Sequence, residues 1–230
     1  HRLLNKKYNQ QRINTINFRE ATPSDSIYAG LFNLNESEET THFSITDSFG
    51  NAVAVTTTLN TSYGSKVFVN NSGFLLNNEM DDFSSKPGSP NTYGLIGSQA
   101  NSIEPGKRML SSMTPSILEK NDNLFLILGS PGGSTIITSV FQTILNVILF
   151  DMSIQHAVDN KRFHHQWKPE YIYMEKNLAS DSIIKSLQNM GHYIKERNSI
   201  GHVNAIMYDK NTISIGVDKR GDNSGEILNN

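Results

Sequence analysis

An internal threonine, Thr40, is the residue of this sequence best placed to carry chemistry. An acidic stretch of low complexity, residues 33–39, precedes it, and an alternating apolar and polar pattern begins at Thr41. A hydroxyl between a flexible arm and a rigid strand is poorly explained as packing. Cleavage of the Glu39–Thr40 bond would give Thr40 a free α-amine, which can act as the general base for its own hydroxyl. The sequence therefore predicts a latent N-terminal nucleophile at Thr40.

Two adjacent glycines, Gly132 and Gly133, are the next candidates. They lie between a predicted buried strand, residues 125–128, and a predicted apolar helix that begins at about Thr135. Such a pair can present backbone N–H groups beside the positive end of a helix, which suits an oxyanion hole. The alternative is a tight turn that needs glycine for its backbone angles. No Gly-Lys-Ser/Thr sequence follows, so a phosphate-binding loop is not expected.

A cluster of carboxylates follows the apolar residues 74–76 at the end of a predicted strand. It contains Glu79, Asp81 and Asp82, three carboxylates within four positions. Such a cluster can bind an ammonium group or a divalent cation. The alternative is a solvated polar turn.

Two pairs of polar residues complete the candidates. Ser111 and Ser112 can donate hydrogen bonds to a carboxylate, or can be ordinary serines of a loop or helix start. His164 and His165 suggest a metal site, but adjacent side chains of an extended segment point in opposite directions. A structural role is therefore favoured for the two histidines.

The composition bounds the class of protein. With 230 residues and 37% hydrophobic content, the chain can bury one sizeable core. The formal net charge is -2, so the chain lacks the excess of positive charge that binds phosphates, and we expect no nucleic-acid partner. The absence of cysteine excludes disulfides, thiol catalysis and zinc–thiolate sites. The longest apolar run, residues 136–150, is too short to cross a membrane, and we expect a soluble, processed piece that lacks its targeting sequence.

The elements that position these residues indicate an α+β fold with mostly antiparallel sheets, because local hairpins dominate. Residues 1–39 are polar and predict no core of their own, and residues 84–107 predict a long loop typical of a lid. Predicted strands cover residues 42–46, 52–58, 125–128, 203–208 and 213–217, and predicted helices cover residues 135–150, 153–157 and 181–190.

Taken in order, the longer motifs resemble the small subunit of the γ-glutamyltranspeptidase family, preceded by the end of the large subunit. The similarity covers essentially all of the chain from Thr40 to the C-terminus, without a large insertion or deletion. The motifs that carry it are residues 40–44, 50–56, 75–83, 108–113, 129–134 and 162–167.

This resemblance implies an N-terminal-nucleophile hydrolase fold, a four-layer αββα sandwich made by autocleavage of one precursor. It implies that residues 1–39 are the partly disordered C-terminal tail of the large subunit and that residues 40–230 are the catalytic small subunit. It implies no metal and no organic cofactor.

The resemblance also implies a role for each site residue by its motif position. Thr40 is the implied nucleophile, and Thr58 the residue that hydrogen-bonds its hydroxyl or amine. The other implied roles are binding of the donor α-ammonium by Asn60, Glu79 and Asp82, binding of its α-carboxylate by Ser111 and Ser112, an oxyanion hole at Gly132 and Gly133, and a gating aromatic at Tyr93.

The implied reaction moves the γ-glutamyl group of glutathione or a related compound through a γ-glutamyl-threonine ester to water, an amino acid or a peptide. The implied partner is the large subunit of the same precursor, in a heterodimer, and that subunit supplies an arginine from outside this sequence. Two alternatives stay open: a related acylase that cleaves cephalosporins or poly-γ-glutamate, and an uncleaved inactive paralogue. Bacterial members of the family imply a periplasmic or secreted location.

Overall fold

A four-stranded antiparallel sheet lies at the centre of the described part of the chain. The structure is a computed structural model and describes residues 5–27, 39–84, 86, 98–209 and 212–228. The strands, in spatial order, are β11 (Thr212–Val217), β10 (Asn204–Asp209), β6 (Asn123–Gly129) and β5 (Ser116–Lys120). Two hairpins, β5–β6 and β10–β11, join along β6 and β10, so every neighbouring pair is antiparallel.

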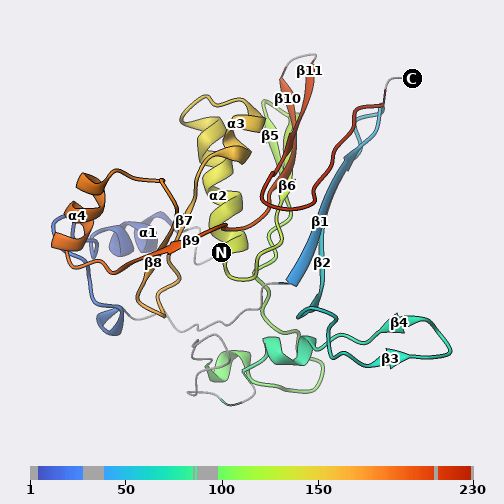
Figure 1. Cartoon of the computed structure of the whole chain (residues 1–230), viewed down its shortest axis with the longest axis horizontal. Helices are drawn as coiled ribbons and strands as arrows, with labels where there is room; N and C mark the ends of the chain where they lie inside the picture. Colours follow the sequence, from blue (N-terminus) through green and yellow to red (C-terminus); the bar gives the residue numbers. More distant parts are fainter. Residues whose placement is uncertain (1–4, 28–38, 85, 87–97, 210–211, 229–230) are drawn as a thin grey trace.

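The two faces of this sheet carry different layers (Figure 1). A β-hairpin covers one face, and two helices cover the other. These elements are β1 (Glu39–Thr46), β2 (Ala52–Asn60), α2 (Thr135–Ile148) and α3 (Ile154–Asp159). The described residues thus form three layers in the order hairpin, sheet and helices.

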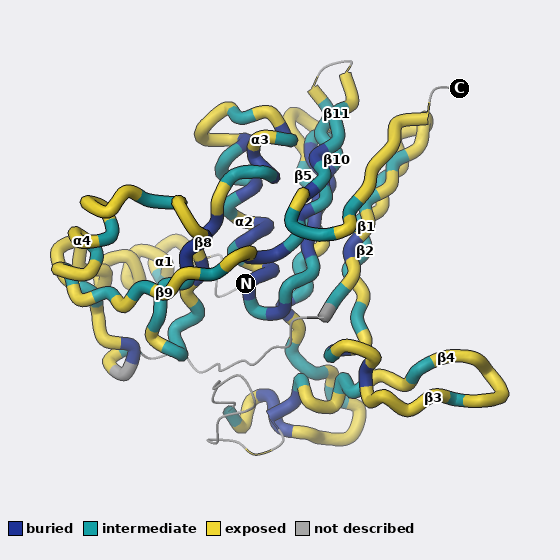
Figure 2. Tube along the Cα trace, in the orientation of Figure 1, coloured by how far each residue is buried: buried dark blue, intermediate teal, exposed yellow. Residues whose placement is uncertain are grey.

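The hydrophobic core lies between the sheet and α2 (Figure 2). Leu126 and Leu128 of β6 are fully buried because the strand is covered on both faces. Ile136, Val140 and Val147 of α2 recur at helical spacing and pack against them. This packing holds the start of α2, and with it the Gly132–Gly133 turn, against the end of β6.

A smaller sheet lies beside the helices, and the N-terminal segment packs on it (Figure 1). Its elements are β7 (Phe163–His164), β8 (Ile172–Glu175), α4 (Asp181–Asn189) and β9 (Ile194–Arg197), and the N-terminal segment contains α1 (Lys6–Ile13) and the short helix η1 (Ser24–Ser26). The Trp167 indole N–H donates to the Ser24 carbonyl oxygen at 2.6 Å, and the Ser24 N–H donates to Glu170 Oε1 at 2.6 Å. No α1 residue is buried, in agreement with the polar composition of this segment. The helix itself was not predicted. The subunit boundary at residue 39 stays a prediction.

A third region extends from the end of the hairpin and contains short elements only (Figure 1). They are β3 (Phe68–Val69), β4 (Phe74–Leu75), η2 (Glu79–Asp82) and η3 (Gln99–Asn101). A bridge between Ser84 and Ser102 joins the two ends of the predicted lid loop. Most of the residues between them lie outside the described part.

The predicted α+β fold with mostly antiparallel sheets is confirmed, with the parallel β8–β9 pair as an exception. The three predicted helices are present, with ends that differ by one or two residues, as is usual for helix termini. Strands β3, β5, β7, β8 and β9 were not predicted, because strands of two to five residues carry little pattern. No helix of the described residues is long and apolar enough to span a membrane.

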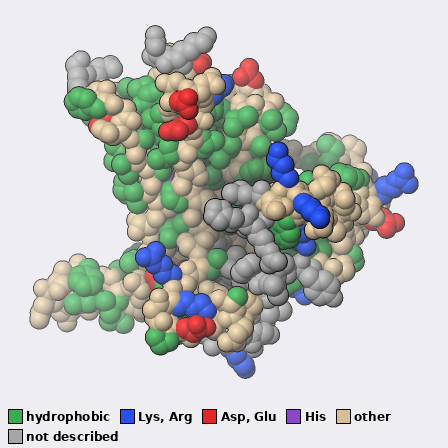
Figure 3. Space-filling model, turned by 180° about the vertical axis from the view of Figure 1, so that it is seen from behind, with side chains coloured by type: hydrophobic (Ala, Val, Ile, Leu, Met, Phe, Trp, Pro, Cys, Tyr) green, Lys and Arg blue, Asp and Glu red, His purple; other side chains and the backbone are tan. Residues whose placement is uncertain are grey.

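The outer face of the β1–β2 hairpin is apolar and exposed among the described residues. Phe43, Ile45 and Val53 point away from the central sheet and are 42%, 56% and 47% exposed. Hydrophobic side chains gather on the side of the molecule that carries this hairpin (Figure 3). The three described layers therefore leave a sheet face on which a further layer can pack.

A buried network of four charged side chains joins the end of the chain to the smaller sheet. Arg162 and Asp218 are each 1% exposed and form an ion pair at 2.9 Å. Arg220 binds both carboxylate oxygens of Glu175, at 2.6 and 2.7 Å, and reaches Asp218 at 3.1 Å. Burial raises the pKa of Glu175, but the hydrogen bond and charge of Arg220 outweigh it and leave this pKa below its ordinary value. Two positive and two negative charges thus compensate one another in the interior.

The variant Glu175→Gln is expected to lower the free energy of unfolding by about 3 kcal/mol, because it leaves two arginines beside one carboxylate. Urea unfolding measures this loss, and Glu196→Gln, at an exposed position of β9, is the control with a change below about 0.5 kcal/mol. Since folding lowers the pKa of Glu175, its contribution is complete above the ordinary value of 4.5 and is lost as the pH falls through the folded-state pKa. Equal losses in the two variants would contradict the prediction.

Candidate active site

Thr40 lies at an irregular point of the β1–β2 ladder. Glu39 pairs with Asn60 and Thr41 pairs with Thr57, so Thr40 alone stands opposite two residues of β2. A bulge of this kind interrupts the regular hydrogen bonds of the ladder, and bulges are enriched next to active sites. The irregularity therefore falls at the predicted cleavage point.

Thr40 lines two cavities that share no other residue. The first encloses about 20 Å³, and its lining includes the predicted site residues Thr58, Asn60, Asp82, Ser111, Ser112 and Gly133. The second encloses about 460 Å³, and its lining includes Gly132, Thr135, Arg197, Ser199, Gly201 and His202. A volume of 20 Å³ is room for about one water molecule, so the first cavity is nearly closed in the continuous chain. The fold thus gathers around Thr40 side chains from several segments that are distant in sequence.

The Gly132–Gly133 turn leaves two backbone N–H groups available beside Thr40. The φ angles of the two glycines are +132° and +54°, a conformation that disfavours residues with a Cβ atom. Their carbonyl oxygens accept hydrogen bonds from the start of α2 and from Ser112 Oγ, which lies 3.0 Å from the Gly133 oxygen. Neither glycine N–H has an acceptor among the described residues. The geometry is therefore consistent with a tight turn, because the backbone angles need glycine. It is also consistent with an oxyanion hole, because the two N–H groups lie at the positive end of a 14-residue helix.

Asn60 adopts an unusual backbone conformation next to Thr58. Its φ angle is +76°, and Asn60 is 3% exposed. A left-handed backbone conformation at a non-glycine residue costs of order 1 kcal/mol of folding free energy. The Asn60 N–H donates to Thr58 Oγ1 at 2.9 Å, and Asn60 Nδ2 donates to the Asn78 carbonyl oxygen at 3.1 Å. These bonds hold both side chains at the first cavity. The direct bond from Thr58 to Thr40 stays a prediction.

The carboxyl groups of Glu79 and Asp82 interact on η2. A hydrogen bond joins them, and burial together with the charge of Glu79 raises the pKa of Asp82 to about 7. Burial also raises the pKa of Glu79, whose buried Oε1 has no hydrogen-bond partner among the described residues. Near pH 7 Asp82 is therefore only partly ionised, and a bound ammonium would favour its ionised form. The described residues include no group of three or more His, Asp or Glu that could hold a metal ion.

The two predicted serines differ in their surroundings. Ser112 is 5% exposed, and its hydroxyl donates to the Gly133 carbonyl oxygen. Ser111 is exposed and its Oγ accepts a hydrogen bond from the Met113 N–H at 3.2 Å. Both serines line the first cavity, but Ser112 also braces the glycine turn, a contact that sequence reasoning did not predict. Tyr93 lies outside the described residues, and its gating role stays a prediction.

His42 is a residue near the site that sequence reasoning missed. Its ring is 5% exposed and hydrogen-bonds Thr56 Oγ1 at 2.8 Å and Ser44 Oγ at 3.0 Å. Burial lowers the pKa of His42 to about 4, so the ring is neutral at pH 7. The alternation of side chains along a strand could have indicated this, because it puts His42 on the same face of β1 as Thr40.

His164 and His165 do not share a site. His164 is buried and bonded to Thr138 Oγ1 and Gln166 Oε1, both at 2.8 Å, and His165 is exposed. Their predicted structural role is therefore confirmed for His164.

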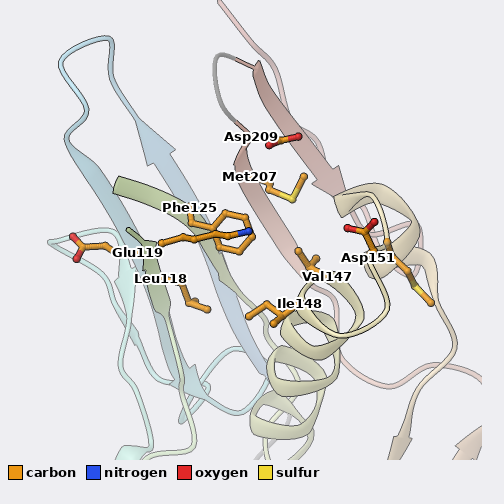
Figure 4. A pocket seen from close by; sticks show the side chains of 10 residues that line it. Leu118, Glu119, Phe125, Val147, Ile148, Asp151, Met207 and Asp209 are labelled. Atoms are coloured by element: carbon orange, nitrogen blue, oxygen red, sulfur yellow. The ribbon is translucent and has the colours of Figure 1, made fainter. Parts of the chain in front are cut away.

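Of the described cavities that do not include Thr40, two are large. One, of about 350 Å³, lies between the C-terminal end of α2 and the central sheet, with Phe125, Val147 and Met207 in its wall and Asp151 and Asp209 at its edge (Figure 4). The other, of about 740 Å³, lies between the N-terminal segment and the smaller sheet. Neither contains Thr40 or the glycine turn, so the candidate active site is the pair of cavities that meet at Thr40.

The chain is similar to known proteins over almost its whole length. A sequence model of the family described as Gamma-glutamyltranspeptidase matches residues 1–228. The chain belongs to this family. The glutathione hydrolase proenzyme of Escherichia coli strain K12 is 45% identical over 205 residues, 89% of this chain and 35% of its own length. That of Pseudomonas aeruginosa is 42% identical over 230 residues, 99% of this chain and 41% of its own length. The chain thus spans 35% to 41% of these two family members.

Solved γ-glutamyltranspeptidase structures share the fold. A mutant of the Helicobacter pylori γ-glutamyltranspeptidase is 50% identical with a TM-score of 0.76, over 79% of this chain and all of that chain. The Bacillus anthracis transpeptidase CapD is 25% identical with a TM-score of 0.63, over 82% of this chain and 99% of that chain. A cephalosporin acylase from Bacillus halodurans, at 23% identity and a TM-score of 0.76 over 97% of this chain and 38% of that chain, shows likeness of fold alone. The expected N-terminal-nucleophile hydrolase fold is confirmed.

The variant Glu79→Gln is expected to lower the pKa of Asp82 from about 7, because it removes the neighbouring negative charge while burial remains. The pH dependence of the ¹³C shift of the Asp82 side-chain carboxyl measures this pKa. Asp81→Asn is the matched control, since the charge of Asp81 makes the smaller contribution. A decrease that is equal in both variants, or larger in the control, would show that Glu79 is not the main charged neighbour.

Proposed function

We propose that the protein is a γ-glutamyl transferase and hydrolase that acts on glutathione and related γ-glutamyl compounds. The observation that carries this proposal is the position of Thr40 where two cavities meet, beside two glycine N–H groups that have no acceptor within the described part of the chain. The first cavity has the chemistry to bind a free amino-acid head group, namely the carboxylate of Asp82, which is hydrogen-bonded to Glu79, for the ammonium, and the hydroxyls of Ser111 and Ser112 for the carboxylate. Similarity to proteins named glutathione hydrolase proenzyme supports this substrate class.

Maturation is the first step of the proposed mechanism. The Thr40 hydroxyl attacks the carbonyl carbon of Glu39, the C–N bond breaks, and an ester to Thr40 Oγ1 forms as the proton moves to the released amine. Water then hydrolyses the ester, which leaves Thr40 with a free α-amine and a free hydroxyl. The bulge at this bond supports the step, because an irregular ladder holds the peptide less firmly than a regular one.

Acylation follows in the matured enzyme. The α-amine of Thr40 takes the hydroxyl proton, and the oxygen attacks the γ-carbonyl of the donor. A neutral α-amine suits this task because its ordinary pKa, near 8, is close to the working pH. The N–H groups of Gly132 and Gly133 stabilise the oxyanion, a contribution of about 3 kcal/mol per donor in comparable sites. The amine then leaves with a proton, and a γ-glutamyl ester on Thr40 remains.

Deacylation completes the cycle. Water attacks the ester and releases glutamate, or the amine of an amino acid or peptide attacks it and forms a new γ-glutamyl amide. In both routes the attacking group gives its proton through the α-amine to Thr40 Oγ1. No step calls for a metal or organic cofactor.

The proposed partner is a large subunit from the same precursor, in a heterodimer. The exposed apolar face of the hairpin supports this, because Phe43, Ile45 and Val53 would be buried by one further layer. The donor carboxylate also needs an arginine that the family resemblance places in that subunit. A periplasmic or secreted location is proposed on the resemblance alone, and cell fractionation tests it.

The alternative acylase activities have less support. Identity is 50% to a γ-glutamyltranspeptidase structure, against 25% to CapD and 23% to the cephalosporin acylase. The serine hydroxyls and the Glu79–Asp82 pair also favour a zwitterionic head group, which a cephalosporin side chain need not carry. An inactive paralogue would have no need to keep Thr40, Thr58 and both glycines of the turn.

Cleavage of the precursor tests the proposal directly. Expressed with its large subunit, the protein is expected to yield a fragment that begins Thr-Thr-His-Phe and to hydrolyse γ-glutamyl-4-nitroanilide. Thr40→Ala should abolish both cleavage and activity, and Thr40→Ser, which keeps a hydroxyl, should keep slower versions of both. Intact mass, N-terminal sequencing and anilide release are the measurements. A wild-type chain that stays uncut and inactive would overturn the proposal.

The variant Asp82→Asn is expected to raise the KM for the donor roughly tenfold, because a charge-assisted hydrogen bond to the ammonium is lost. The change in kcat should be smaller, since the head group is bound in both the ground state and the transition state. Asp81→Asn is the control, because Asp81 is exposed and does not line the cavity. Steady-state kinetics with the anilide donor separates the two constants. A fall in kcat alone would contradict the role in binding.

A further inference from the structure

Two buried hydroxyl groups lie beside the backbone of the Gly132–Gly133 turn. Ser130 is fully buried, and Thr135, the first residue of α2, is 2% exposed. Ser130 Oγ donates to the Pro131 carbonyl oxygen at 2.6 Å, and Thr135 Oγ1 donates to the Gly132 carbonyl oxygen at 2.7 Å. Each hydroxyl therefore binds the carbonyl of one of two successive peptide groups.

These two peptide groups are the ones that carry the candidate oxyanion donors. The Pro131 carbonyl and the Gly132 N–H belong to one peptide group, and the Gly132 carbonyl and the Gly133 N–H belong to the next. A hydrogen bond accepted by the carbonyl of a peptide group makes its N–H more polar, because hydrogen bonds in a chain polarise one another. Ser130 and Thr135 thus each act on a different N–H group of the turn.

The bond from Thr135 differs from the usual bond of a buried threonine. The Gly132 carbonyl oxygen already accepts from the Thr135 N–H at 3.1 Å, so the shorter bond from the hydroxyl is a second one to the same oxygen. Thr143 of the same helix shows the usual case, since its fully buried hydroxyl donates to the Ser139 carbonyl oxygen at 2.9 Å, inside the helix. The Thr135 hydroxyl is therefore directed at the turn.

The Ser130 hydroxyl is held from its other side by the segment that follows β9. The His202 N–H donates to Ser130 Oγ at 2.8 Å, and a Cβ atom on Gly201 would lie 2.9 Å from the same oxygen. The Gly201 Cα also packs on the turn, because a Cβ atom on Gly132 would lie 3.1 Å from it. A chain of hydrogen bonds thus runs from the His202 N–H through the Ser130 hydroxyl to the peptide group of the Gly132 N–H.

We propose that Ser130 and Thr135 are positioning residues of the oxyanion hole, whose hydroxyls fix the two peptide groups and strengthen both N–H donors. This inference rests on the proposed function. Negative charge develops on the donor γ-carbonyl oxygen when Thr40 Oγ1 attacks it, and again when water or an amine attacks the ester. The two N–H groups stabilise the charge at both moments, so the hydroxyls support acylation and deacylation alike.

The variant Thr135→Val tests one peptide group in the matured enzyme with its large subunit, with γ-glutamyl-4-nitroanilide as donor. It keeps the shape of the side chain and is expected to lower kcat roughly fivefold, less than the about hundredfold loss that follows removal of a whole donor. The KM should stay within about twofold, because the oxyanion forms only after the donor has bound. Thr135→Ser keeps a hydroxyl and should bring kcat back to within about twofold of the wild type. The kcat is expressed per cleaved enzyme, counted by intact mass.

Thr143→Val is the matched control, because it removes an equally buried hydroxyl from the same helix without contact to the turn. It is expected to change kcat by less than about twofold. Urea unfolding of the variants measures any loss of stability separately from the loss of activity. An equal fall in kcat in the control, or a rise in KM in place of a fall in kcat, would overturn the role of Thr135.

The variant Ser130→Ala tests the other peptide group, and it keeps the proposal testable if Thr135→Val is not cleaved. We expect kcat to fall roughly fivefold and the KM to stay within about twofold. Ser139→Ala is its control, since the fully buried Ser139 donates at 3.4 Å to the Ile200 carbonyl oxygen, beside Gly201, and not to the turn. A wild-type kcat in Ser130→Ala, or an equal fall in its control, would overturn the role of Ser130.

The two levels of proposal fail differently. If the wild type does not hydrolyse the anilide at all, the proposed function fails. If the wild type hydrolyses the anilide and the variants without these hydroxyls keep its kcat, the support of the oxyanion hole by the hydroxyls alone fails.

Discussion

The packing of the His42 ring on Gly129 is the constraint on which the active site depends. β1 carries Thr40, and β6 leads through Gly129 into the Gly132–Gly133 turn, so the spacing of the two layers sets the distance between Thr40 and the glycine N–H groups. A Cβ atom at residue 129 would overlap the imidazole, so glycine is needed for this close approach. The ring is neutral because burial holds the pKa of His42 near 4, and hydroxyls of the hairpin satisfy both nitrogens.

Charge compensation holds the opposite side of the site. Gly201 lines the cavity next to Arg197, and the buried Arg162 donates hydrogen bonds to the carbonyl oxygens of Ile200 and Gly201. That guanidinium is stable in the interior because Asp218 and Glu175 surround it, together with Arg220. Asp218 and Arg220, which follow β11, thus help to hold the Gly201 segment against the Gly132–Gly133 turn. Packing of the neutral His42 ring positions Thr40, and buried ion pairs position the groups on the other side of the site.

Particular residues show how far sequence reasoning reached. Thr40, the glycine pair and the carboxylate cluster were predicted because their signals are local: a break in composition, a strand-to-helix junction, and three acids in four positions. The second role of Ser112, as a donor to the Gly133 carbonyl, was missed because the two residues are 21 positions apart. The raised pKa values of Glu79 and Asp82 were missed because their main cause is burial, which sequence alone does not reveal.

By itself, the sequence determined the class of fold, the family, the candidate nucleophile, the β1–β2 hairpin, and the junction of β6 with α2, because periodicity and motif order are properties of neighbouring residues. Only the tertiary structure decided which residues share a cavity with Thr40. The grouping of Arg197, His202 and Gly132 in one cavity, and of Thr58, Asp82 and Gly133 in another, depends on how the hairpin, the central sheet and the smaller sheet pack. Such packing depends on contacts between distant segments, and a local pattern carries no information about the distance between them.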